Sequence, residues 1–192
     1  SAFSSYAMVA FRKQDDKSTE AGAKYLLIGA FSSALTLYGI SLLYALTGSI
    51  TFEGMRSFFT GLNNEVVSGN FDEVIFISSL FILAGLGFKI AVVPFHAWAP
   101  DVYQGAPTPV TTLLAAGSKA MGFVALFRVF LFTMESVSDE WKLILGIIAL
   151  ASMTIGNLAA ITQDDIGRML AYSSIAQAGY ILIAVPALTD DA

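Results

Sequence analysis

The chain has 192 residues, of which 56% are hydrophobic and only 13% are charged, and it carries a formal net charge of −5. Because an ordinary soluble domain has about 25% charged residues, this composition argues against a water-soluble globular protein. The sequence contains no cysteine, which excludes disulfides and thiol-based metal or redox sites. It also lacks a basic face of the kind that binds nucleic acid.

The charged residues gather in short stretches at residues 12–24, 53–73, 135–142 and 164–168. Between them the chain is almost purely apolar, as is typical of a protein that crosses a bilayer several times. Residues 1–11 are apolar from the start and lack the basic region of a signal peptide. We interpret them as the last turns of a helix whose beginning is missing.

Five apolar segments come after this stub, at about residues 25–46, 74–103, 108–132, 143–161 and 169–188. At about 1.5 Å per residue, the first is long enough to cross a hydrocarbon core of about 30 Å. Alternating segments of about ten residues, which would indicate a membrane β-barrel, are not seen. The sequence therefore predicts an all-α, polytopic membrane helix bundle. It forms a single partial domain over residues 1–192, with five transmembrane helices and a terminal stub.

The connections between the segments suggest a short extra helix and an orientation. In the connector 47–72, apolar residues recur at helical spacing and predict an interfacial helix: Phe52, Met55, Phe58, Phe59 and Leu62. If the first loop is cytoplasmic, the basic residues near that side are Arg12, Lys13, Lys17, Lys24 and Arg168, against Arg56 and Lys142 opposite. The excess of positive charge favours a cytoplasmic first loop.

The second segment contains Pro94 in the middle of an apolar run that continues through Trp98. Proline cannot donate a backbone hydrogen bond, and its ring clashes with the carbonyl of Ile90. We therefore expect a discontinuous helix whose second half covers about residues 95–103. Broken helices in membranes occur where protein or trapped water satisfies the freed backbone, often at ion sites. The alternative is a helix that ends at Val93, with a proline-rich surface loop after it.

Lys119 is the firmest functional signal in the sequence. Thr108 and Pro109 are a good helix start, and Lys119 comes about three turns later, which places it near the membrane midplane. Its helical neighbours Ala115, Ala116, Gly122 and Phe123 are mostly small, which favours close helix packing and a position inside the bundle. A charge at that depth costs at least about 2.5–3.5 kcal/mol. The ammonium must therefore be paired, hydrated or partly neutral, and a static ion pair is the alternative to a proton relay.

Lys89 lies shortly before Pro94, and its depth depends on the helix break. If the helix breaks there, Lys89 lies at mid-membrane, and Gly85 one turn away leaves room for water or a partner helix. If the helix ends there, the side chain snorkels to the surface. No acidic residue lies deep in any of the five segments, so the carboxylate that would pair with these lysines must lie elsewhere.

Several other polar residues are secondary candidates. His96, just after the break, is either a hydrogen-bonded structural residue or a relay. Ser173 and Gln177, together with Tyr180 and Asn157, could hold a water chain, although hydrogen bonding between helices is the commoner use of such residues. Arg128 lies near the outer end of its segment and is expected to snorkel.

The run KIAVVPFHAWAPDVYQGAPTPVT at residues 89–111 closely resembles the antiporter-like subunits of proton-pumping respiratory complex I. Three further stretches agree: KSTEAGAKYLLIGAFSSALTLYGISLLYALTGS, GSKAMGFVALFRVF and DDIGRMLAYSSIAQAGYILI. The form DVYQGAPTPV favours the N-type subunit, also called chain 2. The L and M types and the sodium/proton antiporter relatives have different versions of this segment.

The resemblance implies roles for both lysines. Lys89 falls on the family's lysine in the broken seventh helix and Lys119 on its lysine in the eighth, and both are taken there as proton-carrying groups. The family pairs the first of these with a glutamate of the fifth helix, which by alignment would lie just before Ser1. We therefore expect the chain to be an internal piece of a longer subunit, inactive by itself.

The function implied is that of a non-redox, proton-translocating subunit of an NADH (or related donor):quinone oxidoreductase. We expect it in a bacterial or archaeal plasma membrane, beside the other membrane subunits of the complex. NAD, flavin, iron–sulfur clusters and quinone would be bound by those partners, with no cofactor or metal site in this chain. The alternatives are a subunit of a multi-subunit sodium/proton antiporter and a structural membrane scaffold.

Overall fold

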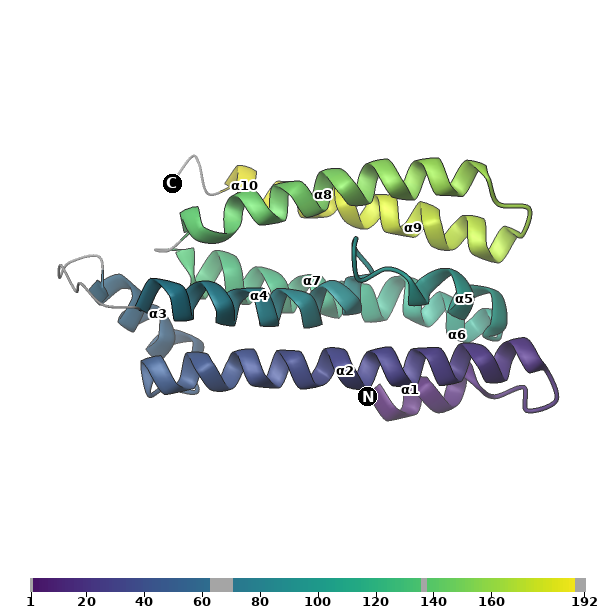
Figure 1. The fold of residues 1–192 in the computed structure, drawn as a ribbon, viewed down its shortest axis with the longest axis horizontal. Coiled ribbons are helices and arrows are strands. Elements are labelled where there is room, and N and C mark those ends of the chain that lie inside the picture. Colours follow the sequence, from purple (N-terminus) through teal and green to yellow (C-terminus); the bar gives the residue numbers. More distant parts are fainter. Residues whose placement is uncertain (1, 63–70, 136–137, 189–192) are drawn as a thin grey trace.

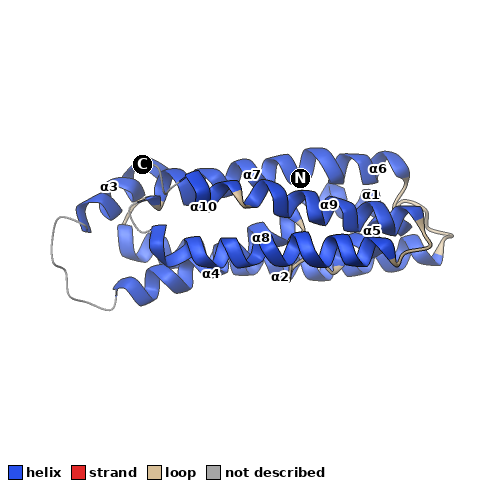
Figure 2. Ribbon diagram, turned by 90° about the horizontal axis from the view of Figure 1, so that it is seen from above, coloured by secondary structure: helices blue, strands red, loops and turns tan. Residues whose placement is uncertain are grey.

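The computed structural model describes residues 2–62, 71–135 and 138–188, and within these ranges the secondary structure is entirely helical. The helices run roughly parallel along an elongated bundle, as Figures 1 and 2 show from two sides. In chain order they are α1 Ala2–Val9, α2 Asp16–Thr47, α3 Phe52–Leu62, α4 Phe71–Ile90, α5 Trp98–Gly105, α6 Thr108–Leu113, η1 Leu114–Ser118, α7 Lys119–Phe127, η2 Arg128–Thr133, α8 Ser138–Ile161, α9 Ile166–Leu182 and α10 Ala184–Leu188.

Five of these helical runs are long and apolar enough to cross a membrane. They are Asp16–Thr47, Glu73–Ile90, Thr108–Thr133, Trp141–Ile161 and Ile166–Ala187. Large apolar side chains such as Leu27, Leu143 and Leu158 point outward and are more than 60% exposed, as expected where lipid takes the place of water. The predicted multi-pass helical membrane protein, with five spans after a helical stub, is confirmed.

The first span is longer than predicted because the charged residues before the apolar run are helical too. α2 begins at Asp16, where the Asp15 side chain accepts a hydrogen bond of 3.1 Å from the Lys17 amide and caps the helix. It ends at Thr47, and the next residue, Gly48, caps it with a φ of +66°, which suits glycine at a helix C-terminus. The predicted interfacial helix in the connector is present as α3, while residues 63–70 of that connector lie outside the described residues.

The third span is one continuous helical run, but it is not a regular α-helix. It passes from α6 through the π-helical turn η1 into α7 and then into a second π-helical turn, η2. In η2 the Met134 amide donates to the Val129 carbonyl at 3.0 Å, five residues back. Apolar periodicity predicts the span but carries no signal for the extra residue that each π turn accommodates.

Charged contacts hold the two ends of the bundle. At one end Asp101 accepts hydrogen bonds from Lys24 at 2.7 Å and from Arg168 at 2.5 Å, which ties α5 to α2 and α9. At the other end Arg56 of α3 pairs with Glu135 at 3.0 Å. The helices also pack through buried aromatic and aliphatic side chains. Where α2, α4 and α5 meet, the Tyr25 ring stacks on the rings of Phe88 and Trp98, which are tilted against each other.

Candidate functional site

The predicted helix break is present between α4 and α5, at residues 91–97. Ala91 has a φ of +57°, a left-handed conformation that ends α4, and the Val93–Pro94 peptide is cis. In Figure 1 the connecting segment leaves the line of α4 and α5 and rises toward α8. The second half of the helix is buried, with Trp98, Ala99 and Val102 at most 2% exposed. The alternative of a proline-rich surface loop is therefore excluded.

Side chains from other elements satisfy backbone groups that the break leaves without helical partners. The Val93 amide donates to the Ser152 hydroxyl of α8 at 2.9 Å, and the Trp98 indole of α5 donates to the Phe88 carbonyl at 3.0 Å. Buried backbone groups must be paired in hydrocarbon because no bulk water is present. Protein contacts thus fix the shape of the break, and sequence reasoning did not identify Ser152 as part of it.

Lys119 lies inside the bundle, as predicted, and is 5% exposed. Its ammonium donates to the Ser174 carbonyl at 2.8 Å and to the Ser174 hydroxyl at 2.9 Å, both on α9. Within the described residues it has no carboxylate partner. An ammonium has three hydrogens to donate, so these two contacts leave one hydrogen for water or for a group outside the described residues.

The π turn η1 directly precedes Lys119 and changes which neighbours share its face. Gly122 and Phe123 are buried beside it, as predicted, whereas Ala116 is exposed. The physical reason is that a π turn holds more residues than an α turn and so rotates the helical segment before it relative to the segment after it. π turns inside α-helices are frequent at functional sites.

Lys89 lies half-buried in the last turn of α4, and its aliphatic stem rests against α7. A Cβ atom built on Gly122 of α7 would lie 3.4 Å from Lys89 Cγ and 2.6 Å from Ile90 Cγ2. Gly122 comes about one turn after Lys119, so both predicted lysines lie where α4 and α7 meet. Within the described residues Lys89 has no hydrogen bond or ion pair. Its packing against α7 places it beside the break, so the alternative in which it snorkels to the membrane surface is not required.

The other predicted residues are placed less centrally. Ser173 and Gln177 lie on the exposed face of α9, and the residue that contacts Lys119 is instead Ser174. The sequence has serine at both positions 173 and 174, and it gives no indication of which of the two faces the interior of the bundle. Asn157 donates to the Tyr180 hydroxyl at 3.0 Å, a hydrogen bond between α8 and α9 of the commoner structural kind.

Two buried polar atoms near the break lack a hydrogen-bond partner among the described residues: His96 Nδ1 and the Tyr103 hydroxyl. Tyr103 lies near Ser174, but the two hydroxyls do not meet hydrogen-bond geometry. His96 is half-buried just after Pro94. Unpaired buried polar atoms in a native structure call for a water or an ion, so the surroundings of Lys119 and the break are suited to holding ordered water.

The comparison with known families decides the identity of the chain. Residues 1–192 match the family model described as NADH:quinone oxidoreductase/Mrp antiporter, transmembrane. The chain belongs to this family. NADH-quinone oxidoreductase subunit N of Desulforamulus reducens is 47% identical over 183 residues, which cover 95% of this chain and 37% of that protein. NAD(P)H-quinone oxidoreductase subunit 2 of Trichormus variabilis is 46% identical over 189 residues, covering 97% and 35%.

Solved structures agree with this family assignment. A chain of respiratory complex I from Thermus thermophilus with bound aureothin superposes with a TM-score of 0.75 at 38% identity, covering 96% of this chain and 37% of that one. The resemblance to N-type antiporter-like subunits is thus confirmed. The chain spans little more than a third of the length of these relatives, which are subunits of multi-subunit membrane complexes.

Proposed function

We propose that the chain is part of an antiporter-like N-type subunit that moves protons through the membrane arm of a quinone-reducing respiratory complex. The observation that carries this proposal is the position of Lys119, an ammonium buried between helices and held by uncharged oxygens of Ser174. A buried lysine with neutral acceptors can lose and regain its proton without breaking an ion pair. Lys89 and Lys119 are its proton-carrying groups.

In the proposed mechanism, quinone reduction in other subunits changes the charges along a line of ionisable groups in the membrane. A carboxylate of the longer subunit pairs with Lys89 in one state. When that carboxylate moves away, the protonated form of the half-buried Lys89 becomes less favourable, and its proton passes to Lys119. His96 and ordered water beside the break would bridge the two lysines. Pro94, which has no amide hydrogen to donate, keeps α4 and α5 from joining into one continuous helix there.

The subunit does no redox chemistry in this proposal. NAD, flavin, iron–sulfur clusters and quinone belong to partner subunits, and this chain supplies the translocase part of the enzyme. It lies in a bacterial or archaeal plasma membrane, with the loop that carries Arg12 and Lys24 on the cytoplasmic side, as the distribution of basic residues favours.

The decisive test is Lys119→Ala in the intact subunit within its complex. Membrane vesicles are assayed for quinone-dependent proton uptake and, separately, for electron transfer to quinone. Losing a group that carries protons should lower proton uptake by at least about tenfold, and electron transfer should fall with it where the two are coupled. Lys13→Ala, in the exposed first loop, is the matched control and should leave both unchanged. Normal uptake in Lys119→Ala would refute the relay.

The same vesicles separate the two alternatives. A sodium/proton antiporter subunit would exchange the two ions in vesicles given a sodium gradient and no electron donor, whereas the proposed subunit moves protons only while quinone is reduced. A scaffold subunit would leave proton uptake intact after both Lys89 and Lys119 are replaced by alanine, provided that the complex still assembles.

A further inference from the structure

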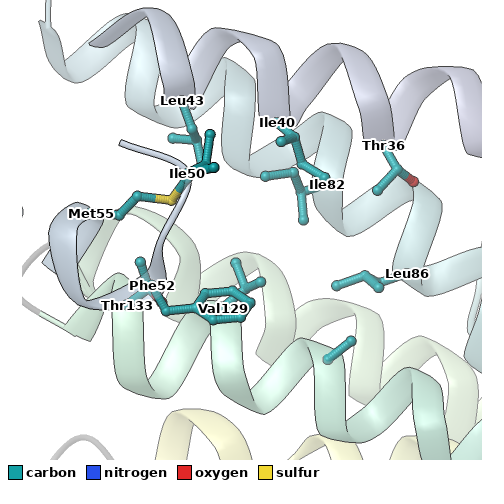
Figure 3. A pocket seen from close by; sticks show the side chains of 11 residues that line it. Thr36, Ile40, Leu43, Ile50, Phe52, Met55, Ile82, Leu86, Val129 and Thr133 are labelled. Atoms are coloured by element: carbon teal, nitrogen blue, oxygen red, sulfur yellow. The ribbon is translucent and has the colours of Figure 1, made fainter. Parts of the chain in front are cut away.

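The bundle contains an apolar cavity of about 280 Å³ on the α3 side of the lysines, which are not among its lining residues. Figure 3 shows its walls, which come from α2, α4, α7, η2, the start of α3 and the connector before α3. Residues of its lining that matter here are Ile40, Leu43, Ile82, Leu86, Phe52 and Val129. The cavity opens to the outer surface, since Ile40 and Phe52 are each 44% exposed.

The shape of the cavity suits a hydrocarbon chain. Along α2 it extends from Thr36 to Leu43, a distance of about 10 Å at the rise of an α-helix. The space is therefore long enough along α2 to hold a run of several methylene groups. Its lining is almost entirely aliphatic and aromatic.

Arg128 stands at the rim of this cavity, and none of the described residues forms an ion pair with it. Its guanidinium lies 4.2 Å from the centre of the Phe132 ring and 5.6 Å from that of Phe52. Phe52 lines both the cavity and an adjoining surface hollow that Arg128 also lines. The neighbouring acid Glu135 is already paired with Arg56, and among the described residues Arg128 has no ion pair. An arginine fork of this kind is well matched to phosphate oxygens.

The depths of the two features fit one molecule. Arg128 lies about one and a half turns from the end of its span at Thr133, and stacking on Phe132 directs its guanidinium toward that end. The cavity reaches from Thr133, at that end of the span, to Ala125 on the side of the bilayer interior. A lipid tail gains no hydrophobic energy by leaving other tails, because lipid is as apolar as leucine. Selective binding must therefore come from the head group, and Arg128 is the group that can supply it.

We propose that this cavity holds one acyl chain of a membrane phospholipid whose phosphodiester is bound by Arg128. The lipid would fill the space between α2 and η2 and join α3 to the bundle. This site is separate from the lysines and does not depend on the proton-transfer proposal. The competing occupant is a helix from the remainder of the longer protein.

The test uses the full-length subunit in its complex, reconstituted into phosphatidylcholine nanodiscs. Two probes carry the same photoreactive group at the end of one acyl chain: a phosphatidylglycerol and the corresponding diacylglycerol, which lacks the phosphate. Labelled peptides are quantified by mass spectrometry. We expect the phosphatidylglycerol probe to label the cavity segments of α2, α4 and η2 about fivefold more than the diacylglycerol, the effect of one arginine near the membrane surface.

Variants separate the head group from the tail. Arg128→Gln should reduce labelling by phosphatidylglycerol to the level of diacylglycerol, while Arg12→Gln, in the exposed first loop at the other end of the bundle, should keep the preference. Ala125→Leu, which fills the cavity, should reduce labelling by both probes. Equal labelling of wild type by the two probes would overturn the proposal. So would an absence of label in the cavity of wild type, which would mean that protein covers it.

Discussion

At the scale of single residues, the decisive contact is the one between Lys119 and Ser174. Neutral acceptors stabilise an ammonium less than a carboxylate would, because hydrogen bonding to a charged partner is stronger. A lysine that is held weakly can change its proton occupancy when a nearby charge moves. One locked in an ion pair cannot do so without separating two charges in a medium of low dielectric.

Ser174→Ala is expected to lower quinone-dependent proton uptake by about tenfold or more, because it removes one hydrogen bond from a charged donor, worth about 1.5–3 kcal/mol, and leaves the carbonyl in place. The measurement is the initial rate of acidification in vesicles that contain the intact complex. Ser173→Ala is the matched control, since Ser173 is the adjacent, exposed residue of the same helix. Equal losses in the two variants would show that the Ser174 contact has no special role.

The two partners in this contact differ in how far sequence could predict them. The depth of Lys119 is set by the helix start at Thr108 and by a fixed rise per residue, so burial could be predicted. Ser174 could not, because its direction depends on how α9 is rotated against α7. That rotation is set by tertiary packing, including the close approach of Gly156 to the backbone of Ala176.

At the scale of elements, α4 and α7 approach one another closely where the lysines lie, and Gly122 makes that approach feasible. Small residues at helix contacts in membranes allow backbones to come near each other. The position leaves no room for a methyl group, because Ile90 Cγ2 would lie 2.6 Å from an added Cβ. The stem of Lys89 is packed on the same glycine, so the geometry of the helix contact and of the lysine are coupled.

Gly122→Ala should therefore push α4 and α7 apart, destabilise the subunit by about 1–3 kcal/mol as overpacking does, and reduce proton uptake as well. Stability is measured by denaturant unfolding of the purified subunit and uptake in vesicles. Gly146→Ala in α8 is the control, since nothing lies within 4 Å of its added Cβ. Wild-type stability and uptake in Gly122→Ala would contradict the packing argument.

The elements themselves were largely predictable, and the irregularities only partly so. Proline chemistry at Pro94 predicts the break, because the missing amide and the ring clash are local effects. The two π turns and the Ser152 contact were not predictable. A π turn needs one extra residue that leaves apolar periodicity nearly unchanged, and Ser152 lies on a distant helix that is brought to Val93 only by folding.

At the scale of the whole molecule, Asp101 joins three helices that are far apart in sequence. Burial alone would raise the pKa of Asp101, but hydrogen bonds from Lys24 and Arg168 outweigh burial and hold that pKa below its usual 3.8. A carboxylate whose pKa is lower in the folded state stabilises the fold above its ordinary pKa. That contribution is lost as the pH falls through the lowered value.

Asp101→Asn should accordingly lower the unfolding temperature at neutral pH by about 2–4 °C, and this difference from wild type should shrink as the pH falls below the ordinary value of 3.8. Thermal unfolding of the intact subunit in nanodiscs between neutral and acid pH provides the measurement. Asp164→Asn, an exposed acid in the loop before α9, serves as the control. A difference that stays constant over the whole pH range would argue against the Asp101 contacts as its source.

The length of α2 has a mechanical consequence for the bilayer around the protein. Its 32 residues extend about 48 Å at the α-helical rise, well beyond a hydrocarbon thickness of about 30 Å. Only the uncharged part after Lys24 matches the lipid, and Lys24 is tied to Asp101 at that boundary. The ion pair therefore fixes the depth at which the bundle sits. A thicker bilayer would either have to pull Lys24 and Asp101 apart or become thinner around the protein. Membrane thickness is therefore linked to whether α2 and α5 stay joined at this end of the bundle.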